Sequence, residues 1–193
     1  MAASGGNGSG STFAARNHFS LFGLPVKFGV DLAALESAWR AVQGAVHPDR
    51  FAGGTDAQRL LALQYSTQIN EAHETLKDPV RRAAYLCQLH GVAIDAERNT
   101  AMPEDFLMQQ MEWRESMEDA VAASDVRGLS QLAEEVRASI AESEVLLEHL
   151  LDRPSADPVR ASAEVRRLMF LTKFQSQVIQ EQRRVSHGTA ADR

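Results

Sequence analysis

Apolar residues recur at three- and four-residue intervals along most of the chain, a period that predicts amphipathic helices rather than strands. One such segment follows Asp31, a residue type suited to the N-cap of a helix, and ends at Val46. A second begins after the loop and cap at 53–56, with apolar positions at Leu61, Tyr65, Ile69, Ala72 and Leu76. We expect the two segments to pair as an antiparallel helical hairpin.

Two shorter helical patterns flank the hairpin. The apolar stretch at 18–24 is stopped by Pro25, because a proline ring cannot continue a helix. A second short helix is expected to begin with Asp78 as cap and Pro79 as first helical residue, and to end before Gly91. Residues 17–91 are therefore predicted to form one domain. The preceding residues 1–16 are rich in Gly, Ser and Ala and predict a flexible tail.

Three longer helical patterns follow at about 103–122, 125–152 and 158–186, each with an apolar side of helical period. They come after 92–102, which has no sustained period and is the expected linker. Two of them carry the clearest apolar seams, at Leu129, Leu132, Val136, Ile140, Leu147 and Leu150, and at Val165, Leu168, Leu171, Phe174 and Val178. A three-helix bundle over 103–187, followed by a flexible tail at 188–193, is the economical arrangement, so the predicted fold class is all-α.

Composition supports an all-α protein of one domain or two small ones. The 193 residues are 44% hydrophobic but only 6% aromatic, and helix-forming residue types recur. No apolar run approaches the ~20 residues that span a bilayer, and the first residues lack the basic and apolar regions of a secretion signal. Cys87 is the single cysteine, which excludes an intrachain disulfide and a cysteine-cluster metal site. We expect a cytoplasmic protein that does not act on a membrane.

The formal net charge of -6 is unevenly placed along the chain. Residues 17–91 hold seven basic and seven acidic residues, whereas residues 92–193 hold twelve and nineteen. A nucleic-acid-binding protein would show a concentrated basic stripe, and the sequence has none. The acidic C-terminal half fits a protein partner with basic groups, or serves solubility alone.

The tripeptide His47-Pro48-Asp49 lies between the two helices of the predicted hairpin. Pro48 disfavours the α conformation at His47, so the preceding helix must end near Val46 and leave both polar side chains on a loop. Core packing does not account for them there, which favours a functional role. A His–Asp dyad for general-base catalysis is conceivable, but no Ser or Cys nucleophile or phosphate-binding loop is marked out nearby. The six histidines form no i, i+4 pair suited to a metal.

The segment 103–122 has two apolar sides when it is drawn as a helical wheel with Leu107 at ~0° and ~100° per residue. One side, at about 220–280°, is suited to a bundle core and holds Phe106, Trp113, Met117 and Ala120. The other, at about 0–140°, is apolar and then acidic and holds Leu107, Met108, Met111, Glu112, Glu115 and Asp119. Since a bundle core needs one side, the second is a candidate recognition surface. The alternative is that Leu107 and Met108 pack on the first domain or on the third bundle helix.

Four blocks of sequence resemble one protein family. They are HFSLFGLP at 18–25, HPDRF at 47–51, INEAHETLKDPVRRAAYLCQLHG at 69–91 and FLMQQMEWRE at 106–115. Together they look like an HscB-type J-domain co-chaperone of iron–sulfur cluster assembly, and the similarity covers Asn17 to about Arg184. The first two blocks would suit any J-domain, whereas the last two point to the iron–sulfur branch.

The resemblance implies a partner-driven mechanism without catalytic residues, metal or cofactor, in a protein of bacterial type. A J-domain at 17–91 would bind an HscA-type chaperone ATPase and stimulate its ATP hydrolysis through His47, Pro48 and Asp49, with Arg40 and Arg50 as supporting cations. The C-terminal bundle would bind the IscU-type iron–sulfur scaffold protein. The residues that match the family's scaffold-binding face are Leu107, Met108, Met111, Glu112, Glu115, Asp119 and Phe170.

The chain departs from this family pattern in the helix before the tripeptide. J-domains usually carry several basic residues there and often an aromatic residue immediately before the histidine; this chain has only Arg40 in that helix, and Val46 before His47. Arg40, Arg50 and Lys27 are the available cations, and each is equally explained as an ordinary surface charge. Two other functions remain open: a J-domain adaptor whose bundle binds different clients, and a small hydrolase that uses His47 and Asp49.

Overall fold

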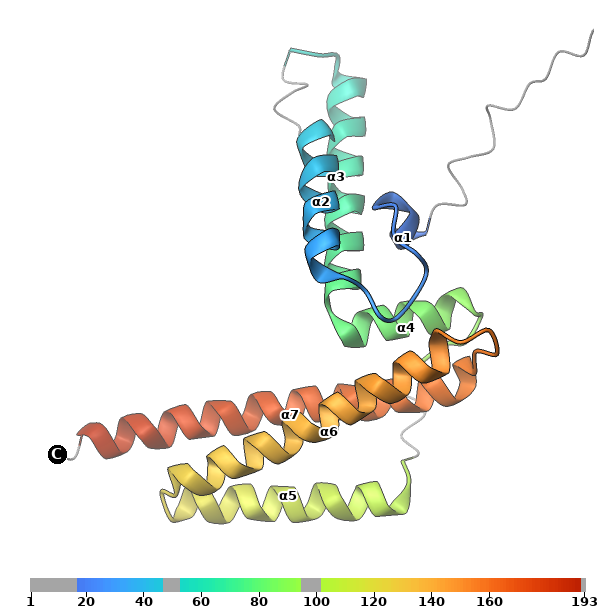
Figure 1. Cartoon of the computed structure of the whole chain (residues 1–193). Helices are drawn as coiled ribbons and strands as arrows, with labels where there is room; N and C mark the ends of the chain where they lie inside the picture. The colour runs from blue at the N-terminus through green and yellow to red at the C-terminus, as the bar shows by residue number, and fades with distance from the viewer. Residues whose placement is uncertain (1–16, 47–52, 95–101, 192–193) are drawn as a thin grey trace, which may run out of the picture. The chain divides into compact units, whose positions relative to one another are not determined.

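The computed structural model describes residues 17–46, 53–94 and 102–191, with side chains described as far as residue 187. These ranges contain seven helices and no strand (Figure 1), so the predicted all-α fold class is confirmed. The chain divides into two compact units, Met1–Arg82 (unit 1) and Ala83–Arg193 (unit 2), which are described separately. Within the described part of the chain, no helix is both long enough and apolar enough to cross a membrane.

Unit 1 contains α1 (His18–Leu21), α2 (Leu32–Val46) and α3 (Asp56–Lys77). The caps that begin α2 and α3 are those that the sequence indicates. The Asp31 carboxylate accepts hydrogen bonds from two backbone N–H groups in the first turn of α2, at 2.9 and 3.1 Å. Thr55 and Gln58 form a reciprocal capping box at the start of α3. Side-chain caps therefore satisfy N–H groups that have no partner inside the helix.

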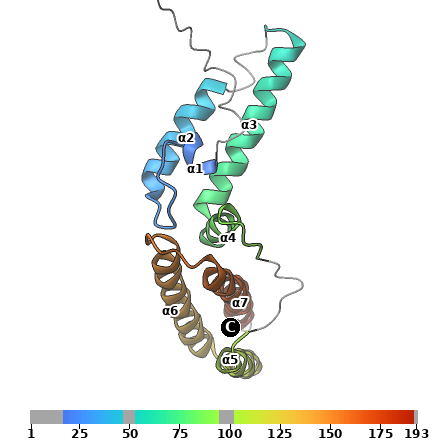
Figure 2. The ribbon, with the colours of Figure 1, turned by 90° about the vertical axis from the view of Figure 1, so that its right-hand side faces the viewer.

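The helices α2 and α3 lie side by side in opposite directions, and α1 packs against α3 (Figures 1 and 2). Their shared core contains the fully buried Phe19, Leu35 and Leu76. Leu61, the first position of the predicted apolar stripe of α3, has a side chain that is 51% exposed, whereas the neighbouring Ala62 is buried. The other members of the predicted α3 stripe are buried or half-buried.

The helix α4 (Pro79–Leu89) contains the boundary between the two units. Its start is the predicted one, since the Asp78 carboxylate accepts a hydrogen bond from the backbone N–H of Arg81 at 2.7 Å. Gly91 follows the end of the helix with φ of +76°, a left-handed conformation that favours glycine. The contact boundary at Arg82 lies earlier than the linker at 92–102, so the domain bounds read from sequence stay a prediction.

Unit 2 is a bundle of three long helices, which Figure 2 shows grouped around a common centre. They are α5 (Glu104–Ala122), α6 (Val126–Leu151) and α7 (Pro158–Ala191). Both seams expected from the sequence are confirmed: the predicted positions on α7 are 0–1% exposed, and those on α6 are buried or pack against the core. Burying a large aliphatic side chain contributes ~1.5–3 kcal/mol, so this continuous apolar centre is the main source of stability in the bundle.

One row of aromatic rings joins α5 to α7. The Phe106 ring meets the Phe170 ring edge-on at 5.6 Å between centroids. Phe170 stacks on Phe174 at 5.8 Å, and Phe174 stacks on Trp113 at 6.0 Å. Edge-to-face and stacked pairs at these separations add to the stabilisation from burial alone. The row therefore holds one side of α5 against α7 and leaves the opposite side of α5 facing outward.

The first turn of α6 contains a glycine, Gly128, beside the carboxylate that caps the helix. The Asp125 carboxylate caps α6 by accepting from the backbone N–H groups of Arg127 and Gly128, both at 3.0 Å. A Cβ atom at position 128 would lie 2.6 Å from the Asp125 carboxylate, closer than real Cβ contacts allow. Gly128 thus leaves room for the Asp125 carboxylate to cap α6 directly after the turn that follows α5.

Candidate functional site

The loop tripeptide of the sequence analysis, His47, Pro48 and Asp49, lies outside the described residues, and so does Arg50. The structure does describe the two helices that the tripeptide connects. The described part of α2 runs to Val46, and α3 begins ten residues later at Asp56 and lies antiparallel against α2. The predicted hairpin is therefore confirmed, while the role of its connection stays a prediction.

Arg40 is exposed on α2, seven positions before His47 in the chain. Its guanidinium lies 3.9 Å from the Glu36 carboxylate, at the outer limit of an ion pair, and its side chain is 72% exposed. Exposed pairs of this kind contribute ~0–1 kcal/mol and leave the cation available to a partner. The fold of unit 1 therefore does not depend on the Arg40 side chain.

A polar clamp, formed by Glu36, Trp39, Asn70 and His73, holds α2 to α3. The buried His73 ring stacks on Trp39 at 4.5 Å, and its Nε2 lies 3.0 Å from the Glu36 carboxylate. Trp39 Nε1 donates to the Asn70 side-chain oxygen at 3.1 Å. The hydrogen bond from His73 lowers the pKa of the Glu36 carboxyl below its ordinary 4.5, and the charges of His73 and Lys77 act in the same direction. His73 is thus a structural histidine of the hairpin.

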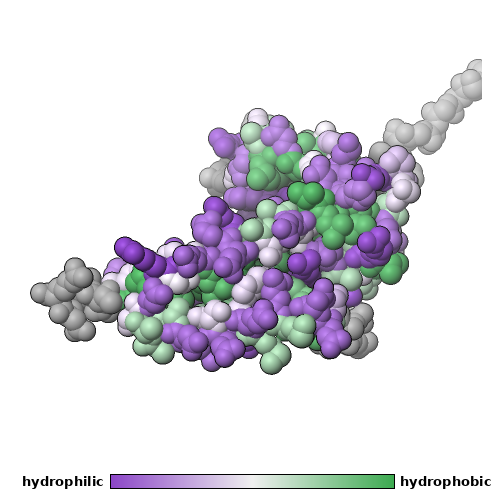
Figure 3. Space-filling model, turned by 60° about the horizontal axis from the view of Figure 1, so that its bottom comes forward, coloured by the Kyte–Doolittle hydropathy of each residue, from purple (hydrophilic) through white to green (hydrophobic). Residues whose placement is uncertain are grey.

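The outward side of α5 carries the candidate recognition surface, called here the α5 face: Leu107, Met108, Met111, Glu112, Glu115 and Asp119. The three apolar side chains are 45%, 57% and 71% exposed, in chain order, and the three acidic residues are exposed as well. In Figure 3, which brings the lower side of the view in Figure 1 forward, pale apolar side chains alternate with hydrophilic ones along this part of unit 2. Phe106 and Trp113 are buried on the opposite side of the helix, so the two-sided wheel is confirmed.

Phe170 stands apart from the other residues assigned to scaffold binding. Its side chain is half-buried and belongs to the aromatic row, between Phe106 and Phe174. It packs against the bundle core as well as reaching the surface. Any effect of replacing Phe170 on binding would therefore include a change in the packing of α5 on α7.

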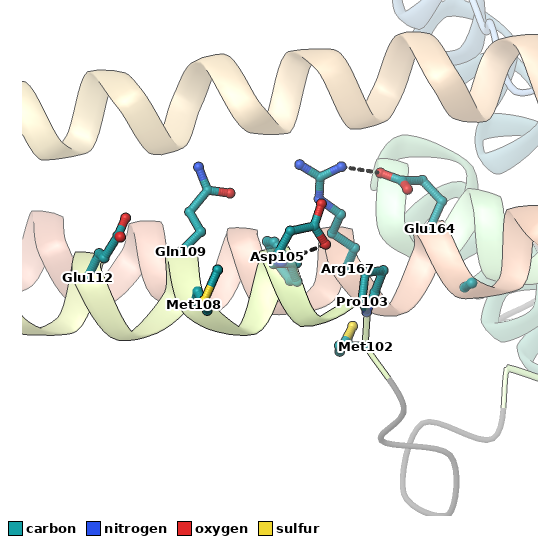
Figure 4. A pocket seen from close by; sticks show the side chains of 10 residues that line it. Met102, Pro103, Asp105, Met108, Gln109, Glu112, Glu164 and Arg167 are labelled. Atoms are coloured by element: carbon teal, nitrogen blue, oxygen red, sulfur yellow. Dashed lines mark hydrogen bonds and ion pairs between the residues drawn. The ribbon is translucent and has the colours of Figure 1, made fainter.

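A pocket of about 460 Å³, which the sequence did not indicate, opens beside the α5 face. We call it the α5–α7 pocket; its polar lining is Asp105, Gln109 and Glu112 from α5 and Glu164 and Arg167 from α7 (Figure 4). Met108 and Glu112 belong to both the pocket and the α5 face. The lining residues of α5 and those of α7 are separated by more than forty positions in the chain. No local sequence pattern could therefore have indicated that they line one pocket.

The C-terminal domain matches a known family model. Residues 102–179 fit the model described as the HSCB C-terminal oligomerisation domain. The solved structure of the chaperone HscB from Vibrio cholerae superposes with a TM-score of 0.77 at 35% identity, covering 88% of this chain and 99% of that one. The human co-chaperone HscB, 23% identical, has the same fold with a TM-score of 0.82 and covers 92% of this chain and 94% of its own. These matches define the chain as a two-part helical co-chaperone.

Sequence relatives extend the match over most of the chain. A co-chaperone protein HscB homolog from Burkholderia multivorans is 53% identical over 162 residues, which are 84% of this chain and 91% of the relative. Another from Burkholderia thailandensis is 47% identical over 171 residues, 89% of this chain and 97% of the relative. The chain belongs to the HscB co-chaperone family.

Proposed function

We propose that this protein is a co-chaperone of iron–sulfur cluster maturation with two separate binding surfaces. The α5 face holds an IscU-type scaffold protein. The hairpin of unit 1 engages an HscA-type chaperone ATPase and stimulates its ATP hydrolysis, with His47, Pro48 and Asp49 as the stimulating residues and Arg40 and Arg50 as supporting cations. Membership of the HscB family supports this assignment.

The observation that carries the scaffold assignment is the exposure of Leu107, Met108 and Met111 on a helix whose opposite side already fills the core. Their burial would stabilise the bundle, yet they remain in contact with solvent. Flexible methionines adapt to the shape of a partner surface, and the adjacent carboxylates favour a basic one. An apolar strip edged by acidic residues is the composition of a binding site rather than of a solvated helix side.

On the chaperone side, the protein acts by binding and not by chemistry of its own. Asp49 is the candidate for an ion pair with a cation of the ATPase. The described residues contain no group of three or more His, Cys, Asp or Glu side chains that could hold a metal ion. We assign no catalytic residue and no cofactor, and we place the protein in the cytoplasm with its two partners.

Scaffold binding is tested by isothermal titration with the full-length chain in which Leu107, Met108 and Met111 are all replaced by Ala. We expect the Kd to rise by at least about a hundredfold, or ~2.7 kcal/mol, because three exposed apolar contacts are removed. Val159→Ala, at another exposed apolar position, is the matched control and should leave the Kd unchanged. Unchanged scaffold binding by the triple variant, with its helix content intact, would refute the α5 face as the binding site.

The chaperone assignment is tested by single-turnover ATP hydrolysis of the HscA-type partner. His47→Gln and Asp49→Asn should abolish stimulation while scaffold binding stays at the level of the unmodified protein. Adding scaffold to the unmodified co-chaperone should raise the hydrolysis rate more than either protein does alone. Stimulation that survives both substitutions would remove the tripeptide from the mechanism.

A further inference from the structure

The α5–α7 pocket continues the α5 face onto a second helix. Asp105, Gln109 and Glu112 follow one another at four- and three-residue intervals on α5, so their side chains leave the same side of the helix, and Glu164 and Arg167 approach from α7 (Figure 4). A partner resting on Met108 and Glu112 would therefore lie across the mouth of this pocket. A volume of about 460 Å³ is enough for a long side chain together with part of its backbone.

The charges in the pocket favour a cation as its occupant. Three carboxylates, from Asp105, Glu112 and Glu164, face a single guanidinium, that of Arg167. Arg167 is already engaged: it lies 3.7 Å from Glu164 and over the Phe106 ring at 4.9 Å. Asp105 and Glu112 make no ion pair within the part of the chain that the structure describes. Their negative charge is thus left uncompensated at the open side.

Two features argue against a carboxylate in the same place. The first-turn N–H of Phe106, which would attract an anion to the start of α5, already donates to the Asp105 carboxylate at 2.8 Å. Glu164, in turn, is held toward Arg167 by a hydrogen bond from the buried Ser143 of α6. An incoming carboxylate would have to displace Glu164 and approach Asp105 and Glu112 as well.

The pocket also has an apolar part, formed by Met102, Phe106 and Met108. Lysine and arginine side chains combine an aliphatic stem with a terminal charge, and they bury the stem while the charge meets polar groups. We infer that the α5–α7 pocket receives a lysine or arginine side chain of the scaffold protein, with its stem against these apolar residues and its charge between Asp105 and Glu112. This inference rests on the proposed scaffold binding and adds Asp105 and Gln109 to the recognition surface.

The test compares two charge reversals in adjacent positions of α5, Asp105→Lys and Glu104→Lys, in the full-length protein. Both residues are acidic, exposed and in the first helical turn, but only Asp105 lines the pocket. We expect Asp105→Lys to raise the Kd for the IscU-type scaffold about tenfold or more, and Glu104→Lys about threefold or less, where tenfold corresponds to ~1.4 kcal/mol. Equal effects would show general electrostatic attraction without a pocket, and tighter binding by Asp105→Lys would show an acidic occupant; either result overturns the inference.

A second pair of variants avoids the Asp105 hydrogen bond at the start of the helix. Position 109 lies four residues after Asp105 and three residues before Glu112. The ammonium group of Gln109→Lys is therefore within reach of both carboxylates and occupies the pocket itself. Gln110→Lys makes the same change at an adjacent half-buried position that does not line the pocket. Scaffold binding should weaken about tenfold with Gln109→Lys and change little with Gln110→Lys. Unweakened binding by Gln109→Lys would contradict the inference.

The failure of this inference can be told from the failure of the proposed function. If the triple Ala variant of the α5 face loses scaffold binding while Asp105→Lys and Gln109→Lys retain it, the scaffold binds the face but places no basic side chain in the pocket. If the triple variant also retains full binding, the scaffold does not use the α5 face, and both proposals fall together.

Discussion

In unit 1 a polar clamp supplements the small apolar core between the helices of the hairpin, whereas in unit 2 the long helices meet mainly along apolar side chains. The clamp joins Glu36 and Trp39 of α2 to Asn70 and His73 of α3 through two hydrogen bonds and one stacked pair of rings. The bundle instead buries complete rows of Leu, Val and Phe between α6 and α7. The stability of the hairpin should therefore respond to pH and to single polar changes, and that of the bundle chiefly to lost volume.

The same contrast supports the proposal that the α5 face binds a partner. Since the aromatic row and the seams of α6 and α7 already stabilise unit 2, the exposed Leu107, Met108 and Met111 are not needed for folding. In unit 1, the exposed Leu60, Leu61 and Leu63 show that α3 too is only partly covered by its described neighbours. The two tryptophans allow the units to be followed separately, because Trp39 belongs to the clamp and Trp113 to the bundle core.

The largest effect is expected from Phe174→Ala. Phe174 is 1% exposed and touches two rings of the aromatic row, so its removal leaves a cavity and should cost ~3–5 kcal/mol of the free energy of unfolding of unit 2. Urea unfolding followed by Trp113 fluorescence, in a Trp39→Phe background, measures it. Met111→Ala is the matched control at an exposed apolar position and should change stability by less than ~0.5 kcal/mol. A comparable loss in the control would place the α5 face in the core.

Two glycine substitutions should change the stability of the two units in opposite directions. Gly128→Ala forces a Cβ atom onto the Asp125 carboxylate and should cost unit 2 ~1–2 kcal/mol by disrupting the cap of α6. Gly44→Ala meets no atom within 4 Å in the interior of α2 and should stabilise unit 1 by ~0.5–1 kcal/mol. Thermal unfolding followed by circular dichroism compares them. Destabilisation by Gly44→Ala would show that α2 requires a glycine at position 44.

Acidification should lower the stability of unit 1 more than that of unit 2, and the difference should be smaller than the effects above. The folded-state pKa of Glu36 lies below its ordinary value, so its contribution to the stability of unit 1 is complete above about pH 4.5 and is lost as the pH falls through the lowered pKa. Glu36→Gln should remove this part of the pH dependence. The measurement is urea unfolding between pH 7 and pH 3, reported by Trp39 in a Trp113→Phe background. An unchanged slope would mean that the Glu36–His73 contact is absent in solution.

The smallest effect on stability is expected from Arg40→Ala. The guanidinium is exposed and its contact with Glu36 is long, so the free energy of unfolding of unit 1 should change by less than ~0.5 kcal/mol. If Arg40 supports the chaperone contact, stimulation of the partner ATPase should nevertheless fall. Arg81→Ala, which removes an exposed cation of unit 1 that is not among the candidate chaperone contacts, is the control. If Arg40→Ala instead destabilises unit 1 clearly, the loss of stimulation would be explained by the fold and not by a contact of Arg40 with the chaperone.

Sequence periodicity predicted most of the helices, but it did not predict how much of each helix surface is buried by neighbouring helices. It located the buried seam of α7 and the two sides of α5, because a 3.6-residue period determines which side chains share a direction. It did not show that Leu61, which continues the apolar stripe of α3, lies where the described neighbours leave that side exposed. It also did not show that Phe170 is half-buried, since this depends on where Phe106 and Phe174 place their rings.

By itself, the sequence determined the all-α class, the caps at Asp31, Thr55 and Asp78, and the apolar and acidic strip on α5. These follow from interactions between residues at most a few positions apart, which the order of the chain specifies directly. Only the tertiary structure decided the clamp around His73 and the α5–α7 pocket. Both require side chains from different helices, and the packing of those helices sets the distance between them.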